Sequence, residues 1–192
     1  MKLLEERIKK DGKILDDGKI IKVDSFLNHQ LDIPFLEKLG DEMYAHFLGK
    51  KVNKILTIEA SGIALATVVS QSFNGIPVVF AKKQRTKNIG SNVYTSEVKS
   101  YTTGKEYTIT VSKEYLNEGD RLLIIDDFLA EGQALRGLID ISNKASAHIC
   151  GLSVAVEKGF QGGGDALRED GYDLLSLAII DSVKDNKIEF RR

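Results

Sequence analysis

One stretch decides how this chain folds: Leu122-Leu-Ile-Ile-Asp-Asp-Phe-Leu-Ala-Glu-Gly-Gln-Ala134. Its uninterrupted apolar run is typical of a strand that is buried on both faces. Two adjacent carboxylates, Asp126 and Asp127, close the strand, and a short loop then leads into a predicted helix at 132–145. In open α/β sheets ligands bind beyond the carboxyl ends of the strands, so we expect a site at this loop.

Strand-like and helix-like segments alternate on both sides of this stretch. Continuous apolar strands separated by helices indicate a parallel sheet covered on both faces. We therefore expect a single α/β domain of the doubly wound kind over residues 1–192. The predicted strands are 19–23, 55–58, 77–81, 121–126, 148–156 and 173–178, and the predicted helices are 1–11, 34–48, 63–73 and 132–145.

The segment before the central strand departs from this alternation. Residues 82–90 are basic and polar, and residues 93–111 are rich in Thr, Tyr, Ser and Val. We predict a long β-hairpin that forms a flap over about 83–111, because loops of that size in compact domains are often functional lids.

Composition excludes some partners. The chain has 27 basic and 28 acidic residues, and this balance leaves no electrostatic footprint for general nucleic-acid binding. No apolar stretch approaches the roughly 18 residues of a membrane span, and no signal-peptide core is visible, so we expect a cytoplasmic protein with no membrane partner. The single cysteine, Cys150, lies in an apolar run, and we expect it to be a core residue.

The end of the central strand combines two kinds of chemistry. A helix N-terminus offers unpaired N–H groups and a positive dipole end, which suit a phosphate. Asp126 and Asp127 would repel a phosphate, but their carboxylates suit ribose hydroxyls or a Mg²⁺ ion shared with them. The alternative is that both merely cap the helix, for which one Asp would suffice. We therefore expect a ligand that carries a sugar and a phosphate, with Asp126 and Asp127 as catalytic residues.

The same stretch resembles the phosphoribosyl-diphosphate signature of the type I phosphoribosyltransferases: four apolar residues, two acids, two apolar residues, then Ala-x-Gly. The resemblance implies a parallel sheet flanked by helices, with a β flap and a small hood from about 1–35 and the C-terminal part. It also implies Mg²⁺ bound with the phosphoribosyl diphosphate, and a homodimer. It places the 5-phosphate on Ala130, Glu131, Gly132, Gln133 and Ala134.

Members of this family usually carry hydroxyl residues in the phosphate loop, where this chain has Glu131 and Ala134. We therefore expect backbone N–H groups and Gln133 to hold the phosphate, with Glu131 pointing away. Glu59-Ala-Ser-Gly62 resembles the family's diphosphate loop, in which Ala60, Ser61 and Gly62 would face the anion, although a plain strand-to-helix turn is the alternative. Lys82 and Lys83 are further candidates for the diphosphate, or members of a solvated basic flap.

The segment Asp24-Ser-Phe-Leu-Asn-His-Gln30 resembles the hood of the xanthine phosphoribosyltransferases within this family. Carried over by position, the purine would meet Ile21, Asn28 and Lys158, with Lys158 at its 6-oxygen. We expect Asn28 to give its NH₂ to the 2-oxygen of xanthine while neighbours fix its carbonyl, so that Asn28→Asp would favour guanine. The alternative is that Asn28 only caps a turn.

The resemblance predicts a purine-salvage pentosyltransferase that converts xanthine and phosphoribosyl diphosphate to xanthosine 5′-monophosphate and diphosphate. Ala130 replaces the Asp of hypoxanthine-guanine enzymes, and a Lys158 ammonium suits a 6-oxo group better than the 6-amino group of adenine. The rivals are another purine phosphoribosyltransferase or a non-catalytic regulator, which would need a DNA-binding segment. Gly162-Gly-Gly164 lacks the spacing of a dinucleotide loop, and we expect a flexible turn there.

Overall fold

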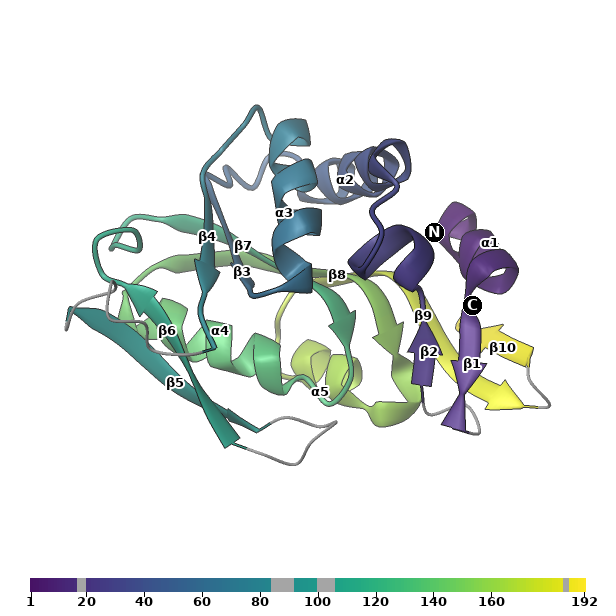
Figure 1. Ribbon diagram of the computed structural model, residues 1–192. Helices are drawn as coiled ribbons and strands as arrows, with labels where there is room; N and C mark the ends of the chain where they lie inside the picture. Colours follow the sequence, from purple (N-terminus) through teal and green to yellow (C-terminus); the bar gives the residue numbers. More distant parts are fainter. Residues whose placement is uncertain (17–19, 84–91, 100–105, 185–186) are drawn as a thin grey trace.

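The computed structural model describes residues 1–16, 20–83, 92–99, 106–184 and 187–192. A sheet of six strands in the order β10-β9-β8-β7-β3-β4 forms its centre (Figure 1). All neighbouring pairs are parallel except β10, which pairs antiparallel with β9. The strands are β3 (Lys54–Ile58), β4 (Val78–Ala81), β7 (Arg121–Leu129), β8 (His148–Lys158), β9 (Leu174–Lys184) and β10 (Lys187–Phe190).

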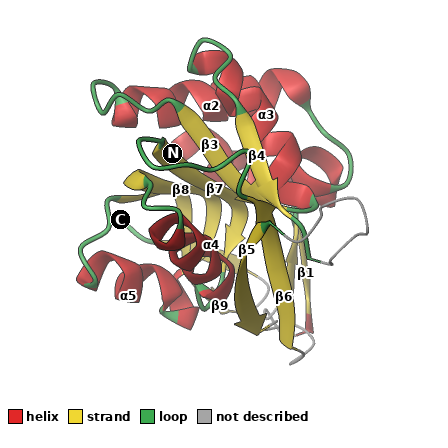
Figure 2. Ribbon diagram, turned by 90° about the vertical axis from the view of Figure 1, so that its left-hand side faces the viewer, coloured by secondary structure: helices red, strands yellow, loops and turns green. Residues whose placement is uncertain are grey.

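Helices cover both faces of this sheet, as the view in Figure 2 shows. One face carries α2 (Ile33–Phe47) and α3 (Ser61–Ser72), and the other carries α4 (Gln133–Lys144) and α5 (Gly163–Glu169). The central strand β7 therefore buries alternate residues in two apolar clusters, with Ile125 in one and Ile124 in the other. This arrangement explains why its sequence is apolar without a polar interruption.

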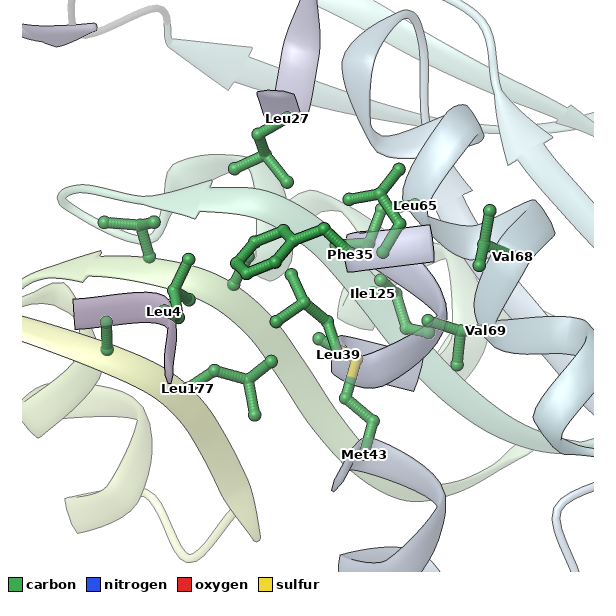
Figure 3. Close-up of a cluster of buried hydrophobic side chains, with 14 of the residues drawn as sticks. Leu4, Leu27, Phe35, Leu39, Met43, Leu65, Val68, Val69, Ile125 and Leu177 are labelled. Atoms are coloured by element: carbon green, nitrogen blue, oxygen red, sulfur yellow. The ribbon is translucent and has the colours of Figure 1, made fainter. Parts of the chain in front are cut away.

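The larger cluster lies under α2 and α3 (Figure 3). Leu39 and Met43 of α2 meet Leu65 and Val69 of α3 above Ile125 of the sheet, at the helical spacing expected for a buried face. Burying one such side chain contributes roughly 1.5–3 kcal/mol, so this layer holds the sheet edge and the site-bearing strand ends in place.

A small peripheral layer packs at one end of the sheet. It comprises α1 (Lys2–Asp11), a hairpin of β1 (Lys13–Leu15) and β2 (Ile20–Lys22), and a π-helical turn at Asp24–Asn28. A second hairpin, β5 (Val93–Lys99) with β6 (Glu106–Ser112), packs on α4. There Val98 lies so close to Gly137 that a Cβ on this glycine would be 2.5 Å from Val98 Cγ2.

The alternating α/β prediction is confirmed, and the predicted core strands and helices are present with shifted ends. Strand β7 continues through both acids to Leu129, and β9 runs to Lys184, beyond the predicted ends. The flap prediction falls partly on 84–91 and 100–105, outside the described residues, but the part that is described is a hairpin. Cys150 is buried as expected. Within the described ranges, the chain has no helix that combines the length and apolarity of a membrane span.

The prediction of a flexible turn at the triple glycine is wrong for two of its three residues. Gly162 is left-handed at φ +76° and forms the turn. Gly163 and Gly164 are buried and begin α5. Gly163 and Gly164 are glycines because a side chain at either position would collide with its neighbours, whereas Gly162 has a left-handed backbone that favours glycine.

Candidate active site

A pocket of about 490 Å³ lies at the carboxyl ends of β7 and β8, between the β1–β2 hairpin and the β5–β6 hairpin. It brings together residues that are more than 130 positions apart in the chain, from Ile20 to Lys158. The lining residues are Ile20, Ile21, Lys22, Asp24, Asn28, Ser61, Lys83, Lys99, Tyr107, Asp127, Phe128, Leu129, Ala130, Glu131, Gly132, Gln133, Ala134, Leu135 and Lys158.

The two adjacent acids have different positions. Asp127 lines the pocket, where its carboxylate accepts hydrogen bonds from Ser61 Oγ at 2.9 Å and from Asn28 Nδ2 at 3.1 Å. Asp126 is buried behind it, and its Oδ1 accepts a bond from the backbone N–H of Asp127 at 2.9 Å. Neither acid caps α4, because the N-cap is Gly132, which gives no side-chain bond. The capping alternative is therefore excluded.

Burial raises the pKa of Asp126 well above its ordinary value, and the charge of Asp127 raises it further. The pKa of Tyr107 is also raised, first by burial and then by the charge of Asp126. These shifts follow from placing acidic groups together away from water. Asp127 is therefore the acid of the pair that is positioned to meet a ligand.

The loop from Ala130 to Ala134 lines the pocket. Gly132 has a left-handed conformation at φ +85°, which glycine adopts without steric cost and which turns the chain into α4. The first N–H groups of a helix have no partner within the helix, so those of α4 can serve an anion. Glu131 is exposed to solvent at the rim of this loop.

The Glu59–Gly62 turn is only partly in contact with the pocket. Ser61 lines it, whereas Ala60 and Gly62 do not. A Cβ on Gly62 would lie 2.4 Å from Thr57 Oγ1 and 3.1 Å from Asp126 Oδ1, so the turn packs tightly on the strand beneath it. The peptide between Glu59 and Ala60 is cis.

The structure separates the two candidate lysines. Lys83 lines the pocket, and its backbone N–H donates to the carboxylate of Glu59. Lys82 pairs through its backbone with Thr110 and lines a different hollow at the β4 edge. Of these two lysines, Lys83 is therefore the one that can reach the candidate site.

All three residues assigned to the purine line the pocket: Ile21, Asn28 and Lys158. Burial lowers the pKa of Lys158. The expected anchor of Asn28 is wrong: its amino group, not its carbonyl, is held by a neighbour, Asp127, and its Oδ1 is buried without a hydrogen-bond partner among the described residues. A carboxylate accepts only, so it selects the amino end of the amide.

Sequence reasoning missed several lining residues. Phe128 occupies one of the two apolar positions after the acids and gives the pocket an aromatic wall. Lys99 and Tyr107 come from the β5–β6 hairpin. The predicted flap was the only signal for them, since the pattern of a hairpin does not say which of its faces meets the site.

Comparison with known proteins places the chain in a family. The model of the phosphoribosyl transferase domain matches residues 23–186. The xanthine phosphoribosyltransferase of Bifidobacterium adolescentis is 53% identical over 193 residues, with 100% of both chains covered. Xanthine phosphoribosyltransferase 1 of Clostridium perfringens is 51% identical over 191 residues, again with 100% of both covered.

Solved structures show the same fold at much lower identity. The adenine phosphoribosyltransferase of Giardia lamblia, complexed with 9-deazaadenine, has a TM-score of 0.74 at 22% identity and covers 92% of this chain and 96% of its own. That of Saccharomyces cerevisiae also has a TM-score of 0.74, at 15% identity, with 92% and 99% covered. The fold is therefore that of the type I phosphoribosyltransferases, and the chain is a pentosyltransferase that belongs to the phosphoribosyltransferase family, among the xanthine phosphoribosyltransferases.

Proposed function

We propose that this chain transfers the phosphoribosyl group of 5-phosphoribosyl 1-diphosphate to xanthine, which yields xanthosine 5′-monophosphate and diphosphate in purine salvage. The observation that supports it best is a single pocket that is lined by Asp127 and the loop 130–134 and also by Asn28 and Lys158. One side suits a sugar phosphate and the other suits a 6-oxopurine.

The residues on the phosphoribosyl side hold the phosphate, the ribose and the diphosphate of the substrate in position. Backbone N–H groups at the start of α4, with Gln133, hold the 5-phosphate, and Asp127 accepts hydrogen bonds from the ribose hydroxyls. Ser61 and Lys83 line the same pocket, and we assign them to the diphosphate that leaves the anomeric carbon, where the Lys83 ammonium would stabilise the departing charge. Holding both reactants in line supplies much of the rate enhancement of such a transfer.

The residues present fit Mg²⁺ brought in by the diphosphate. Mg²⁺ typically keeps several waters and binds one or two carboxylates together with substrate phosphates. Asp127 offers such a carboxylate, and no cluster of three or more His, Cys, Asp or Glu ligands occurs in the part of the chain that the structure describes. Asp127 would hold the ion, which supplies charge neutralisation to the leaving diphosphate.

Asn28 offers xanthine a hydrogen-bond donor. Its amino group has a second N–H besides the one that Asp127 takes. That N–H can donate to the 2-oxygen of xanthine, whereas the 2-amine of guanine cannot accept it. A flipped amide would place its oxygen against the carboxylate of Asp127, so Asp127 keeps the amino end of Asn28 toward itself. Lys158 donates to the 6-oxygen.

The protein is proposed to act as a cytoplasmic homodimer. The hollow at the β4 edge, of about 680 Å³, carries the exposed side chains of Phe80 and Tyr115, and offers an apolar surface to a second copy. Light scattering coupled to size exclusion would give the mass of a dimer. A monomer at micromolar concentration would contradict this assignment.

One assay tests the proposed activity directly. Purified protein is supplied with Mg²⁺, phosphoribosyl diphosphate and xanthine, guanine, hypoxanthine or adenine in turn, and nucleotide formation is measured. We expect the highest kcat/KM with xanthine. Preference for another base would overturn the substrate assignment. If phosphoribosyl diphosphate binds and no base reacts, the non-catalytic regulator is the better description.

A further inference from the structure

The triple glycine after β8 packs directly on the phosphate loop. A Cβ on Gly163 would lie 2.3 Å from the carbonyl oxygen of Ala130, 2.4 Å from the carbonyl carbon of Glu131 and 2.6 Å from the backbone nitrogen of Gly132. All three atoms belong to the main chain, so no side-chain rotation can relieve the contact. Any residue other than glycine at position 163 must displace the loop, the start of α5 or both.

Gly132 in the phosphate loop is in turn close to α5. The Cβ position of Gly132 lies 3.5 Å from the carbonyl oxygen of Gly163 and 3.6 Å from Leu167 Cδ1. Leu167 is fully buried in α5 and belongs to the same apolar cluster as β7 and α4. The outer side of the phosphate loop therefore rests on a wall made by the first turn of α5.

The adjacent Gly164 faces a different group. A Cβ there would lie 2.1 Å from Glu157 Oε1, far from the phosphate loop contact. Glu157 is fully buried and pairs with Arg168 through bonds of 2.7 and 3.1 Å. Because Glu157 belongs to β8 and Arg168 to the last turn of α5, this ion pair joins the C-terminal end of α5 to the sheet. Gly162 has open space around it.

We infer that Gly163 is a positioning residue for phosphoribosyl diphosphate: it sets the path of the loop 130–132, and hence the aim of the N–H groups that hold the 5-phosphate. The inference rests on the proposed function of that loop. The loop carries Glu131 and Ala134 where a hydroxyl could have bonded the phosphate, so its binding depends on the position of its backbone. A misplacement of about 1 Å can cost on the order of 100-fold in activity.

The test compares alanine substitutions at the three neighbouring glycines. Isothermal titration with Mg²⁺ and phosphoribosyl diphosphate gives affinity, steady-state kinetics give both KM values, and thermal unfolding gives Tm. For Gly163→Ala we expect affinity for phosphoribosyl diphosphate to fall by about 10- to 100-fold, with the purine KM at saturating cosubstrate changed less than about twofold. Gly164→Ala should lower Tm through Glu157 and leave that affinity near wild type. Gly162→Ala, strained only by its left-handed backbone, should behave like Gly164→Ala.

Two results would overturn the inference. One is an unchanged affinity for phosphoribosyl diphosphate in a folded Gly163→Ala protein. The other is an equal loss of that affinity in Gly164→Ala, which would mean that a less stable turn, and not the contact with the loop, is the cause. If Gly163→Ala does not fold, Leu167→Val tests the inference instead, because the shorter side chain removes part of the packing against Gly132 without a steric clash. We expect it to weaken binding by about 2- to 5-fold, and unchanged binding would reject the inference. The titration needs no purine, so a wild-type protein inactive on xanthine would reject the proposed function and still test this contact.

Discussion

The two sides of the pocket are built by different means. The phosphoribosyl side is built on the ends of buried elements: β7 carries Asp127, the loop 130–134 continues this strand, and Gly163 backs the loop from α5. The purine side consists of side chains, and two of its members, Ile21 and Asn28, sit on a three-residue strand and a single π-helical turn. The first side is fixed by the sheet, and the second by a thin layer at its periphery.

This difference indicates which substitutions could change the specificity for the purine base without disturbing the core. Moving a main-chain loop on the carboxyl end of a core strand disturbs the core as well, because neighbouring residues of β7 lie in both apolar clusters. Exchanging a polar pocket side chain on the peripheral layer disturbs the core less, because it is the apolar members of this layer, such as Ile21, that belong to the core. Asn28 is the exception, because its bond to Asp127 links the two sides. The following variants test this division.

The largest effect is expected at the carboxylate of the phosphoribosyl side. Exchanging both acids, Asp126→Asn with Asp127→Asn, should reduce activity about 100-fold or more, on the scale of about 2.7 kcal/mol, with the fold intact. Since only Asp127 lines the pocket, Asp127→Asn alone should account for most of the loss. Steady-state kinetics and circular dichroism check both points, with Asp170→Asn as an exposed control. Near-normal turnover in the folded double variant would rule out this role.

Lys158→Ala should separate the two sides. A charge-assisted hydrogen bond is worth roughly 1.5–3 kcal/mol, so the KM for xanthine should rise about 10- to 100-fold while binding of phosphoribosyl diphosphate stays near wild type. Lys83→Ala should weaken the binding of phosphoribosyl diphosphate and leave the KM for xanthine near wild type. If both variants weaken both substrates equally, the division between the two sides is wrong. Because burial lowers the pKa of Lys158, the xanthine KM should also rise at alkaline pH sooner than an ordinary lysine would allow.

Asn28→Asp should break the link between the sides. The sequence alone suggested that this change favours guanine, but the new carboxylate would stand 3.1 Å from that of Asp127. We expect kcat/KM to fall by about 10-fold for both bases, within the 1–3 kcal/mol range of a mispaired buried polar group. Asn28→Ala, which adds no charge, should narrow the preference for xanthine and spare phosphoribosyl diphosphate. A gain in guanine use by Asn28→Asp with unchanged cosubstrate KM would show that Asp127 does not orient the amide.

The sequence was most informative where burial on both faces forces a pattern. The apolar run before Asp126 predicted β7, the loop after it and the start of α4, and the family resemblance is confirmed by full-length relatives. The site roles of Asp127, Asn28 and Lys158 stay predictions, although the structure brings these residues into one pocket.

Long-range packing explains what the sequence could not provide. No local pattern says that Gly163 meets the loop at Ala130, because the two are brought together only by the pairing of β7 with β8. The difference between Lys82 and Lys83 depends on a single bridge to Thr110. The orientation of Asn28 depends on Asp127, which is 99 residues away in the chain.

The smallest effect is expected from Asp126 and concerns stability rather than turnover. Its folded-state pKa lies above the ordinary value of about 3.9, so the folded protein holds a proton that the unfolded chain releases. The free energy of unfolding is therefore highest below that ordinary value and falls as pH rises toward the folded-state pKa, by at most about 1.4 kcal/mol per pH unit.

Asp126→Asn keeps the shape of the protonated acid and cannot ionise, so its stability should decline less over this pH window than that of the wild type. Asp140→Asn is the matched control of opposite sign. Its hydrogen bond with Lys144 lowers the pKa of Asp140, so this acid stabilises the fold above its ordinary pKa and loses that contribution as pH falls. Urea unfolding from about pH 2, below the ordinary pKa of Asp140, up to about pH 8 measures both slopes. Parallel curves for wild type and Asp126→Asn would mean that Asp126 ionises as readily in the folded protein as in the unfolded chain.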